Sequence, residues 1–152
     1  IAITSTIVAQ NCIPDGQYTA PGVYPDSATN LPTAYVGQPY SEVITAVTPA
    51  DTCIVIAFPP CTTVPIDSVI VTSVTGLPPG FTIVSENENA LPFKFLGGTS
   101  SCMLITGNPT VADTGNYPLL TLQVQQLMLM NWQKINLLLL KTIQTHLVIL
   151  QL

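Results

Sequence analysis

The chain has 152 residues, a length typical of one domain with a single hydrophobic core. Only 7% of its residues are charged, the formal net charge is -5, and it contains no Arg. This balance argues against nucleic-acid binding, which needs clustered basic side chains, and the 47% hydrophobic content argues against a disordered chain. The abundance of Thr, Val, Ile and Pro indicates a secreted β protein.

Residues 1–9 are small and apolar, and the step from Ala9 to Gln10 fits a signal-peptidase site. We interpret residues 1–9 as the end of a signal peptide, with an ordinary first strand as the alternative. Residues 10–33 are rich in Pro, Gly and Asp turn signals, so we expect an irregular lead-in there. The domain itself is predicted to occupy residues 10–126.

Four cysteines fit an oxidising compartment outside the cell: Cys12, Cys53, Cys61 and Cys102. Cys53 and Cys61 bracket the short segment "CIVIAFPPC", whose two prolines can fold the chain back. We therefore predict a Cys53–Cys61 disulfide, which leaves a Cys12–Cys102 pair. A metal site is the alternative, but the chain has no CxxC motif and its only His is His146. We expect no metal and no cofactor.

Runs of β-branched and aromatic residues, separated by turn signals, predict about six or seven short strands between residues 34 and 126. They come from "AYVGQPYSEVITAV", "IDSVIVTSVTGLPPGFTI", "CMLITG" and "YPLLTLQV", and the GLPPG sequence within the second run forces a turn. No helical period occurs before residue 127. The pattern predicts an all-β sandwich whose core includes Val43, Val69, Val71, Phe81, Ile105, Tyr117, Leu120 and Leu122.

Four short motifs follow one another at domain spacing: VGQPY at residues 36–40, GLPPG at 76–80, GNPT at 107–110 and GNY at 115–117. Together they resemble the immunoglobulin-like domains of secreted bacterial surface proteins, over residues 31–125. The resemblance implies an immunoglobulin-like β-sandwich, located outside the cell or on its surface. It implies a structural or adhesive role, other domains of the same protein as partners, export by type IX secretion, and no catalytic residues.

Two groups of structural residues match this family. The first is the turn formed by Gly76, Pro78, Pro79 and Gly80. The second comprises Asp113, Gly115 and Tyr117, which resemble a tyrosine corner, where a Tyr hydroxyl bonds to nearby backbone and fixes the end of a sandwich. Similar sequences carry extra cysteines near residues 85–90, where this chain has "SENENA".

Two groups of side chains suggest binding sites but also have simpler structural roles. Glu86 and Glu88, with Asn87 and Asn89, could bind Ca²⁺ weakly, but solvated loop charge is the simpler interpretation. Four aromatic residues could form a face for stacking on glycans, although core or edge packing is the simpler interpretation: Tyr18, Tyr24, Phe93 and Phe95. The sequence predicts a non-catalytic module, with an accessory carbohydrate-binding module of a secreted hydrolase as the alternative.

Residues 127–152 contain no Gly, Pro, Ala, Ser, Asp or Glu. Asn131, Lys134 and Lys141 interrupt the apolar residues, which argues against a membrane span. An amphipathic helix would either lie on a face of the sandwich or mediate self-association. We prefer a third hypothesis, a frameshift, because the shifted codons from Lys141 onward permit Asn-Pro-Asn-Pro-Phe-Ser-Asn-Thr-Thr, which resembles the start of a type IX sorting domain. On each hypothesis we expect the body to fold without these residues.

Overall fold

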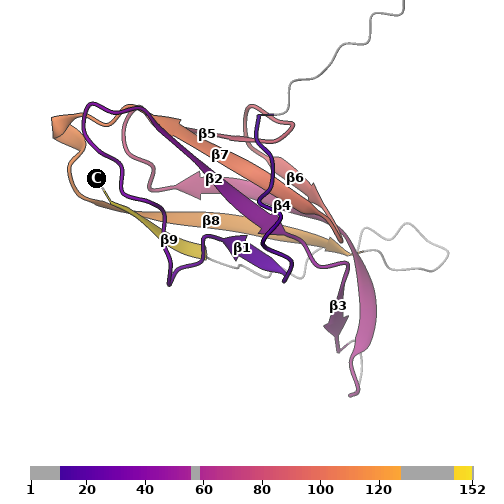
Figure 1. The fold of residues 1–152 in the computed structure, drawn as a ribbon. Coiled ribbons are helices and arrows are strands. Elements are labelled where there is room, and N and C mark those ends of the chain that lie inside the picture. Colours follow the sequence, from indigo (N-terminus) through magenta and orange to yellow (C-terminus); the bar gives the residue numbers. More distant parts are fainter. Residues whose placement is uncertain (1–10, 56–58, 128–145, 152) are drawn as a thin grey trace, which may run out of the picture.

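A computed structural model of the chain describes residues 11–55, 59–127 and 146–151. These residues form two antiparallel β-sheets that pack face to face, as the sequence predicts (Figure 1). The strands are β1 (Gly22–Tyr24), β2 (Tyr40–Val47), β3 (Asp51–Ile54), β4 (Thr62–Thr75), β5 (Thr82–Ser85), β6 (Phe93–Leu96), β7 (Ser100–Gly107), β8 (Asn116–Leu127) and β9 (His146–Gln151). A single 3-10 turn, η1 (Val111–Asp113), is the helical element of the described part. Long helices are therefore absent from the described residues, and the predicted all-β sandwich is confirmed.

The first sheet has the strand order β1-β2-β7-β5. Its centre is the pair β2 and β7, which run antiparallel from Tyr40 opposite Gly107 to Val47 opposite Ser100. Both strands are rich in β-branched residues, which fit a pleated and partly buried surface. The short strands β1 and β5 add to the two edges of this pair.

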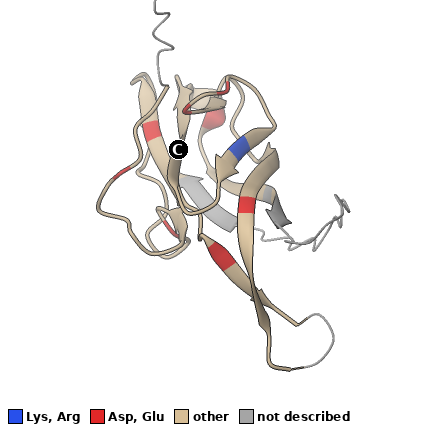
Figure 2. Cartoon of the chain, turned by 90° about the vertical axis from the view of Figure 1, so that its right-hand side faces the viewer, with Lys and Arg blue, Asp and Glu red and all other residues tan. Residues whose placement is uncertain are grey.

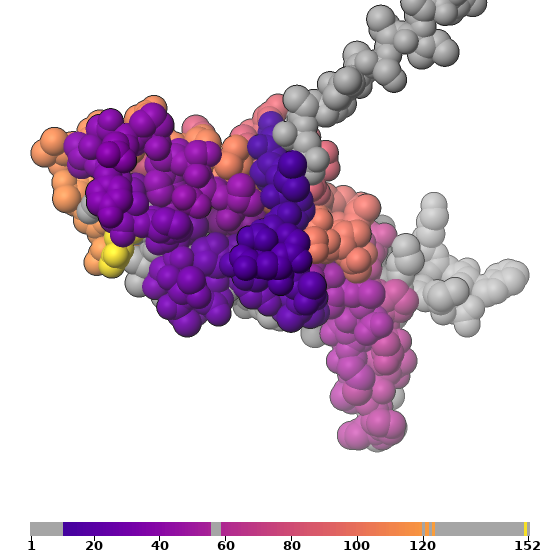
Figure 3. All heavy atoms as spheres, viewed as in Figure 1, coloured from indigo at the N-terminus to yellow at the C-terminus, as the bar shows by residue number. Residues whose placement is uncertain are grey.

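The second sheet has the order β3-β4-β8-β9, and β6 also pairs with β4. Strand β4 is the longest, with 14 residues, and its two ends have different surroundings. Residues from Ile66 to Thr75 pair with β8, whereas Thr62–Pro65 pair with β3. The four outer residues of β4, Thr62–Pro65, and the whole of β3 thus project from the sandwich as a two-stranded arm, which Figure 3 shows extending below the body.

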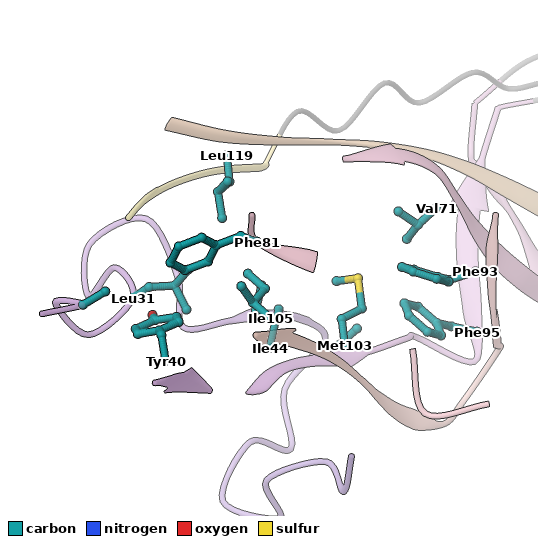
Figure 4. Packing of buried hydrophobic residues seen from close by; sticks show 12 residues of the cluster. Leu31, Tyr40, Ile44, Val71, Phe81, Phe93, Phe95, Met103, Ile105 and Leu119 are labelled. Carbon is teal, nitrogen blue, oxygen red and sulfur yellow. The ribbon is translucent and has the colours of Figure 1, made fainter. Parts of the chain in front are cut away.

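The hydrophobic core lies between the two sheets. In Figure 4, Phe81 lies among Leu31, Tyr40 and Leu119, while Met103 points toward the rings of Phe93 and Phe95. The predicted core residues that the structure confirms are Val69, Val71, Phe81 and Ile105, which are at most 8% exposed.

Two of the predicted core residues are placed differently. Val43 is only half-buried, because the face of β2 that enters the core carries Tyr40, Ile44 and Ala46 instead. Tyr117 is also half-buried, although its side chain packs against the core cluster. The predictions for Leu120 and Leu122 concern side chains outside the described part of the chain.

The GLPPG turn is built as the sequence predicts. Phe81 donates its backbone N–H to the carbonyl oxygen of Pro78, at 3.2 Å. Gly76 has a φ of +92°, and a Cβ at this position would lie 2.0 Å from the carbonyl oxygen of Pro118 in β8. A side chain at Gly76 would therefore be strained and would also collide with backbone. This glycine lets the second sheet close tightly against its own turn.

The end of the chain departs from our expectation. Residues His146–Gln151 form β9, which pairs with β8 from Thr121 opposite His146 to Asn116 opposite Gln151. Ala34 also donates its N–H to the carbonyl oxygen of Gln151, at 3.0 Å. The expectation of a helix, and of a tail without a partner on the body, is wrong for these six residues, because β8 has an edge that accepts a further apolar strand. Residues 128–145, like the predicted signal peptide at 1–9, lie outside the described residues.

Candidate functional site

The two disulfides close very different parts of the molecule. The structure pairs Cys12 with Cys102 and Cys53 with Cys61, the same pairing that the sequence predicts, with Cα–Cα separations of 6.1 and 5.5 Å. Cys12 and Cys102 are 6% and 0% exposed, so this bond ties the lead-in to the central strand β7 inside the protein. Both Cys53 and Cys61 are exposed, and their bond closes the arm.

Hydrogen bonds hold the "SENENA" loop and join it to the lead-in. Glu88 accepts a hydrogen bond from the Ser85 hydroxyl and another from the backbone N–H of Lys94, the latter at 3.3 Å. Asn11 donates its side-chain N–H groups to the carbonyl oxygen of Ser85, at 2.8 Å, and to Oδ1 of Asn89, at 3.0 Å. Two side chains of the Ca²⁺ hypothesis, Glu88 and Asn89, thus hold the loop and fasten the lead-in beside Cys12.

Metal binding also finds no support elsewhere in the described residues. No group of three or more His, Cys, Asp or Glu side chains in that part of the chain is placed to hold a metal ion. The acidic residues are scattered over the strands and loops (Figure 2). Lys94 is the one Lys or Arg in the described ranges, and its Nζ lies 3.7 Å from Oδ2 of Asp67 on the neighbouring strand β4.

Asp113 organises the turn that leads into β8. Its Oδ2 accepts hydrogen bonds from the Thr110 hydroxyl, at 2.6 Å, and from the Thr110 backbone N–H, at 2.8 Å. These two bonds, the hydroxyl first, lower the pKa of the Asp113 carboxyl below its usual value of 3.8. Asp113 is therefore a structural carboxylate. The further prediction that Tyr117 forms a tyrosine corner is not tested and stays a prediction.

A different Tyr has the bond expected of a residue that fixes a corner. The Tyr40 hydroxyl donates to the carbonyl oxygen of Pro32, at 3.0 Å, and so ties the lead-in to β2. Burial raises the pKa of this phenol far above its usual value, and the charge of Glu42 adds to the shift. Sequence reasoning missed this contact, although the VGQPY motif contains the Tyr.

The proposed glycan-stacking face is not assembled. Phe93 and Phe95 are 0% and 2% exposed and belong to the core, so the simpler interpretation holds for these two residues. Tyr18 and Tyr24 are half-buried and stack on each other, with ring centroids 4.2 Å apart and planes 4° apart. Only this pair from the original four remains available to a ligand.

The arm is the candidate surface that sequence reasoning missed. At its outer end Val55 is 60% exposed, and Pro59, Pro60 and the Cys53–Cys61 disulfide are exposed beside it. The segment "CIVIAFPPC" was noted for its cysteines. The lack of any charge between Asp51 and Asp67 was the signal that could have identified the exposed apolar residues Val55, Pro59 and Pro60.

Comparison with family models, with curated proteins and with solved structures finds no match for this chain in any of the three. Within the described residues, no helix has the length and apolar character needed to cross a membrane.

Proposed function

We propose that this chain is a non-catalytic, immunoglobulin-like module that serves as a structural or adhesive unit of a larger secreted or surface protein. One observation carries the proposal, namely the order of the strands. Immunoglobulin domains of the constant type arrange their strands as A-B-E-D in one sheet and C-F-G in the other. The order β1-β2-β7-β5 opposite β4-β8-β9 follows the same arrangement when these strands are lettered along the chain.

The same lettering assigns β8 and β9 to the last two strands of the immunoglobulin order. β8 takes the place of strand F, and β9 takes the place of strand G beside it. The remaining strands, β3 and β6, are additions that pair with β4 along its outer edge. Seven strands in immunoglobulin order, with two additions at one edge, support a variant of that fold rather than an unrelated sandwich.

The use of the polar side chains supports a structural role. The carboxylates of Asp113 and Glu88 bond to their own turns, and that of Asp15 accepts from the backbone and side chain of Gln17. Catalysis needs a nucleophile, a base and a stabilising donor that converge on one point. The side chains named here instead form hydrogen bonds within local turns, and these bonds hold the loops of the sandwich.

Surface labelling tests the proposed location and role. Intact cells of the source organism should bind an antibody raised against the folded chain, and non-reducing peptide mapping of the captured protein should give both disulfides. The captured protein should also be longer than this module alone, because the proposal makes it one unit of a larger protein. An antigen found only after lysis, with reduced cysteines, would contradict the proposal.

The stacked tyrosines give the carbohydrate-binding alternative its one supporting observation. The Tyr18–Tyr24 stack could offer one ring face to a sugar. Affinity electrophoresis of the full chain in gels containing soluble polysaccharides decides between the two functions, and we expect no retardation. Retardation that the Tyr18→Ala/Tyr24→Ala variant loses, while Tyr35→Ala keeps it, would favour the alternative. Tyr35 is a suitable control because it is a single Tyr that is 64% exposed.

A further inference from the structure

β3 forms an open edge of the second sheet in the described part of the chain. It pairs with β4 alone, and in Figure 1 no strand lies on its other side. Ile66 donates its N–H to the carbonyl oxygen of Ala50, at 2.9 Å, so these two residues form a hydrogen-bonded pair. Such pairs alternate with non-bonded pairs along an antiparallel ladder. The backbone N–H and C=O groups of Asp51 and Cys53 therefore face away from β4, and both residues are exposed.

The edges of β5, β6 and β9 are protected by hydrogen bonds from loops. Ser85 of β5 donates its N–H to the carbonyl oxygen of Glu88, at 2.8 Å, and the N–H of Lys94 in β6 bonds to Oε1 of Glu88, at 3.3 Å. Gln151 of β9 accepts from the N–H of Ala34, at 3.0 Å, and β1 is only three residues long. Proteins limit open edges in these ways because an open edge is a template for another strand. Among the described strands, β3 lacks such a bond, and its single Asp is the one feature that opposes pairing.

The arm has a second edge, on β4, and a proline interrupts it. Thr63 and Pro65 lie opposite Cys53 and Asp51, so their backbone groups face away from β3. Pro65 has no N–H to donate, and a strand added at this edge would lack a ladder bond. Asp51 and Cys53 both have an N–H and a C=O. The edge of β3 is therefore the one that suits strand addition.

We propose that the open edge of β3 is a contact site for a second copy of this chain, which adds its own β3 in the antiparallel direction. A two-fold axis between the two Thr52 residues places Asp51 of each copy opposite Cys53 of the other. The paired residues then exchange their backbone N–H and C=O groups. The two Asp51 side chains lie diagonally rather than directly opposite, so the closest pairing of like charges is avoided. This contact joins two sheets into one and goes beyond the structural role proposed above.

Sedimentation equilibrium of the full chain tests the contact at protein concentrations up to about 1 mM, because an interface this small is weak. We expect reversible dimers that added salt strengthens by screening the net charge of -5. Asp51→Pro should lower the association constant by about tenfold or more, because one outward N–H is lost from each copy. Asp51→Ala keeps that N–H and removes the charge, so it should strengthen the dimer. A parent that stays monomeric overturns the proposal, including the case in which the edge binds only strands of other proteins.

Thr63→Pro is the matched control for Asp51→Pro. It also places a proline in the arm, but it removes an N–H that faces the opposite edge. This variant should dimerise like the parent, and all three variants should keep the circular dichroism spectrum and thermal midpoint of the parent. An equal loss of association in the two proline variants, or association that neither of them changes, overturns the proposal.

Hydrogen exchange in the parent tests the same contact without a substitution. At higher protein concentration the amides of Asp51 and Cys53 should exchange more slowly, because they enter the new ladder. The amides of Thr52 and Ile54 already face β4 and should exchange at the same rate as before. Slowing of the same extent at Thr52 and Ile54, or no slowing at Asp51 and Cys53, contradicts the proposed pairing.

Discussion

The arm and the sandwich are parts of one chain that are stabilised in different ways, and β4 belongs to both. Inside the sandwich β4 contributes Val71, which is fully buried and packs with Phe93 and Phe95. At the outer end of the arm, Thr62 and Thr63 of the same strand are exposed. The arm therefore lacks most of the burial that stabilises the sandwich, and an isolated two-stranded ribbon is only marginally stable in water.

The two disulfides follow this division. Cys12–Cys102 is buried and joins residues 90 positions apart, whereas Cys53–Cys61 is exposed and joins residues 8 apart. In the chain-entropy model a longer closed loop restricts the unfolded chain more. The comparison indicates that the buried bond contributes to the stability of the whole domain, while the exposed bond maintains the local shape of the arm.

The largest effect is expected from removing the buried disulfide. The Cys12→Ala/Cys102→Ala variant should lose about 4–5 kcal/mol of unfolding free energy, because its loop is long. Urea unfolding of the full chain, followed by circular dichroism, measures this loss. A loss below about 1 kcal/mol would show that the lead-in contributes little to the sandwich and would remove the contrast between the two bonds.

Removing the exposed disulfide should have a smaller effect. For a loop this short the model gives about 2–3 kcal/mol, and we expect less in the global unfolding free energy because the arm can open while the sandwich stays folded. Hydrogen exchange should accelerate in Asp51–Ile54 and Thr62–Pro65 of Cys53→Ala/Cys61→Ala, and stay unchanged in β7. Faster exchange throughout the sandwich would instead mean that the arm and the body unfold together.

The smallest effect should come from acid, and it should act on the sandwich. The pKa of Asp113 is lowered in the folded state, so its carboxylate stabilises the fold at a pH above the unfolded value of 3.8. This contribution is lost as the pH falls through the lower pKa of the folded protein. NMR titration of the Asp113 carboxyl should show the depressed pKa directly, and Thr110→Val, which removes the hydroxyl donor, should bring it closer to 3.8.

Asp113→Asn supplies the control for the acid prediction. This variant should be less stable than the parent at neutral pH and should lose less stability on acidification, because it has no carboxylate to protonate. The chain has no Asp, Glu, Lys, Arg, His or Tyr between Asp51 and Asp67. Protonation of Asp113 should therefore leave the hydrogen-exchange rates of Cys53 and Ile54 unchanged. An equal acid response in parent and variant would show that another carboxylate is responsible.

The error at the end of the chain has a specific cause. Clear turn signals precede "YPLLTLQV", so the sequence predicts it as the last strand. In the proposed immunoglobulin order this strand would take the place of F, and a G strand would follow it. The run "HLVILQ" has the apolar, β-branched character of such a strand, but its distance along the chain and the unusual composition of residues 127–152 concealed the pairing.

The sequence by itself determined the features that depend on local chemistry. Short β-branched runs between Pro and Gly turns determined an all-β chain, and the GLPPG motif determined a turn with a left-handed glycine. Cys53 and Cys61 are only eight positions apart, which was close enough to predict their bond. Each of these follows from backbone sterics or from loop length. Neighbouring residues are enough to decide such features.

Tertiary structure alone decided which faces and edges meet. Whether Val43 or Ile44 enters the core depends on which face of β2 meets the other sheet. The alternation of side chains along β2 does not determine which of its two faces that is. The place of β9 depends on the edge of β8 that β4 leaves unpaired. The exposure of Val55 depends on β4 extending past the end of its sheet. Contacts between segments distant in sequence set all three, because burial and pairing depend on the partner as well as on the residue.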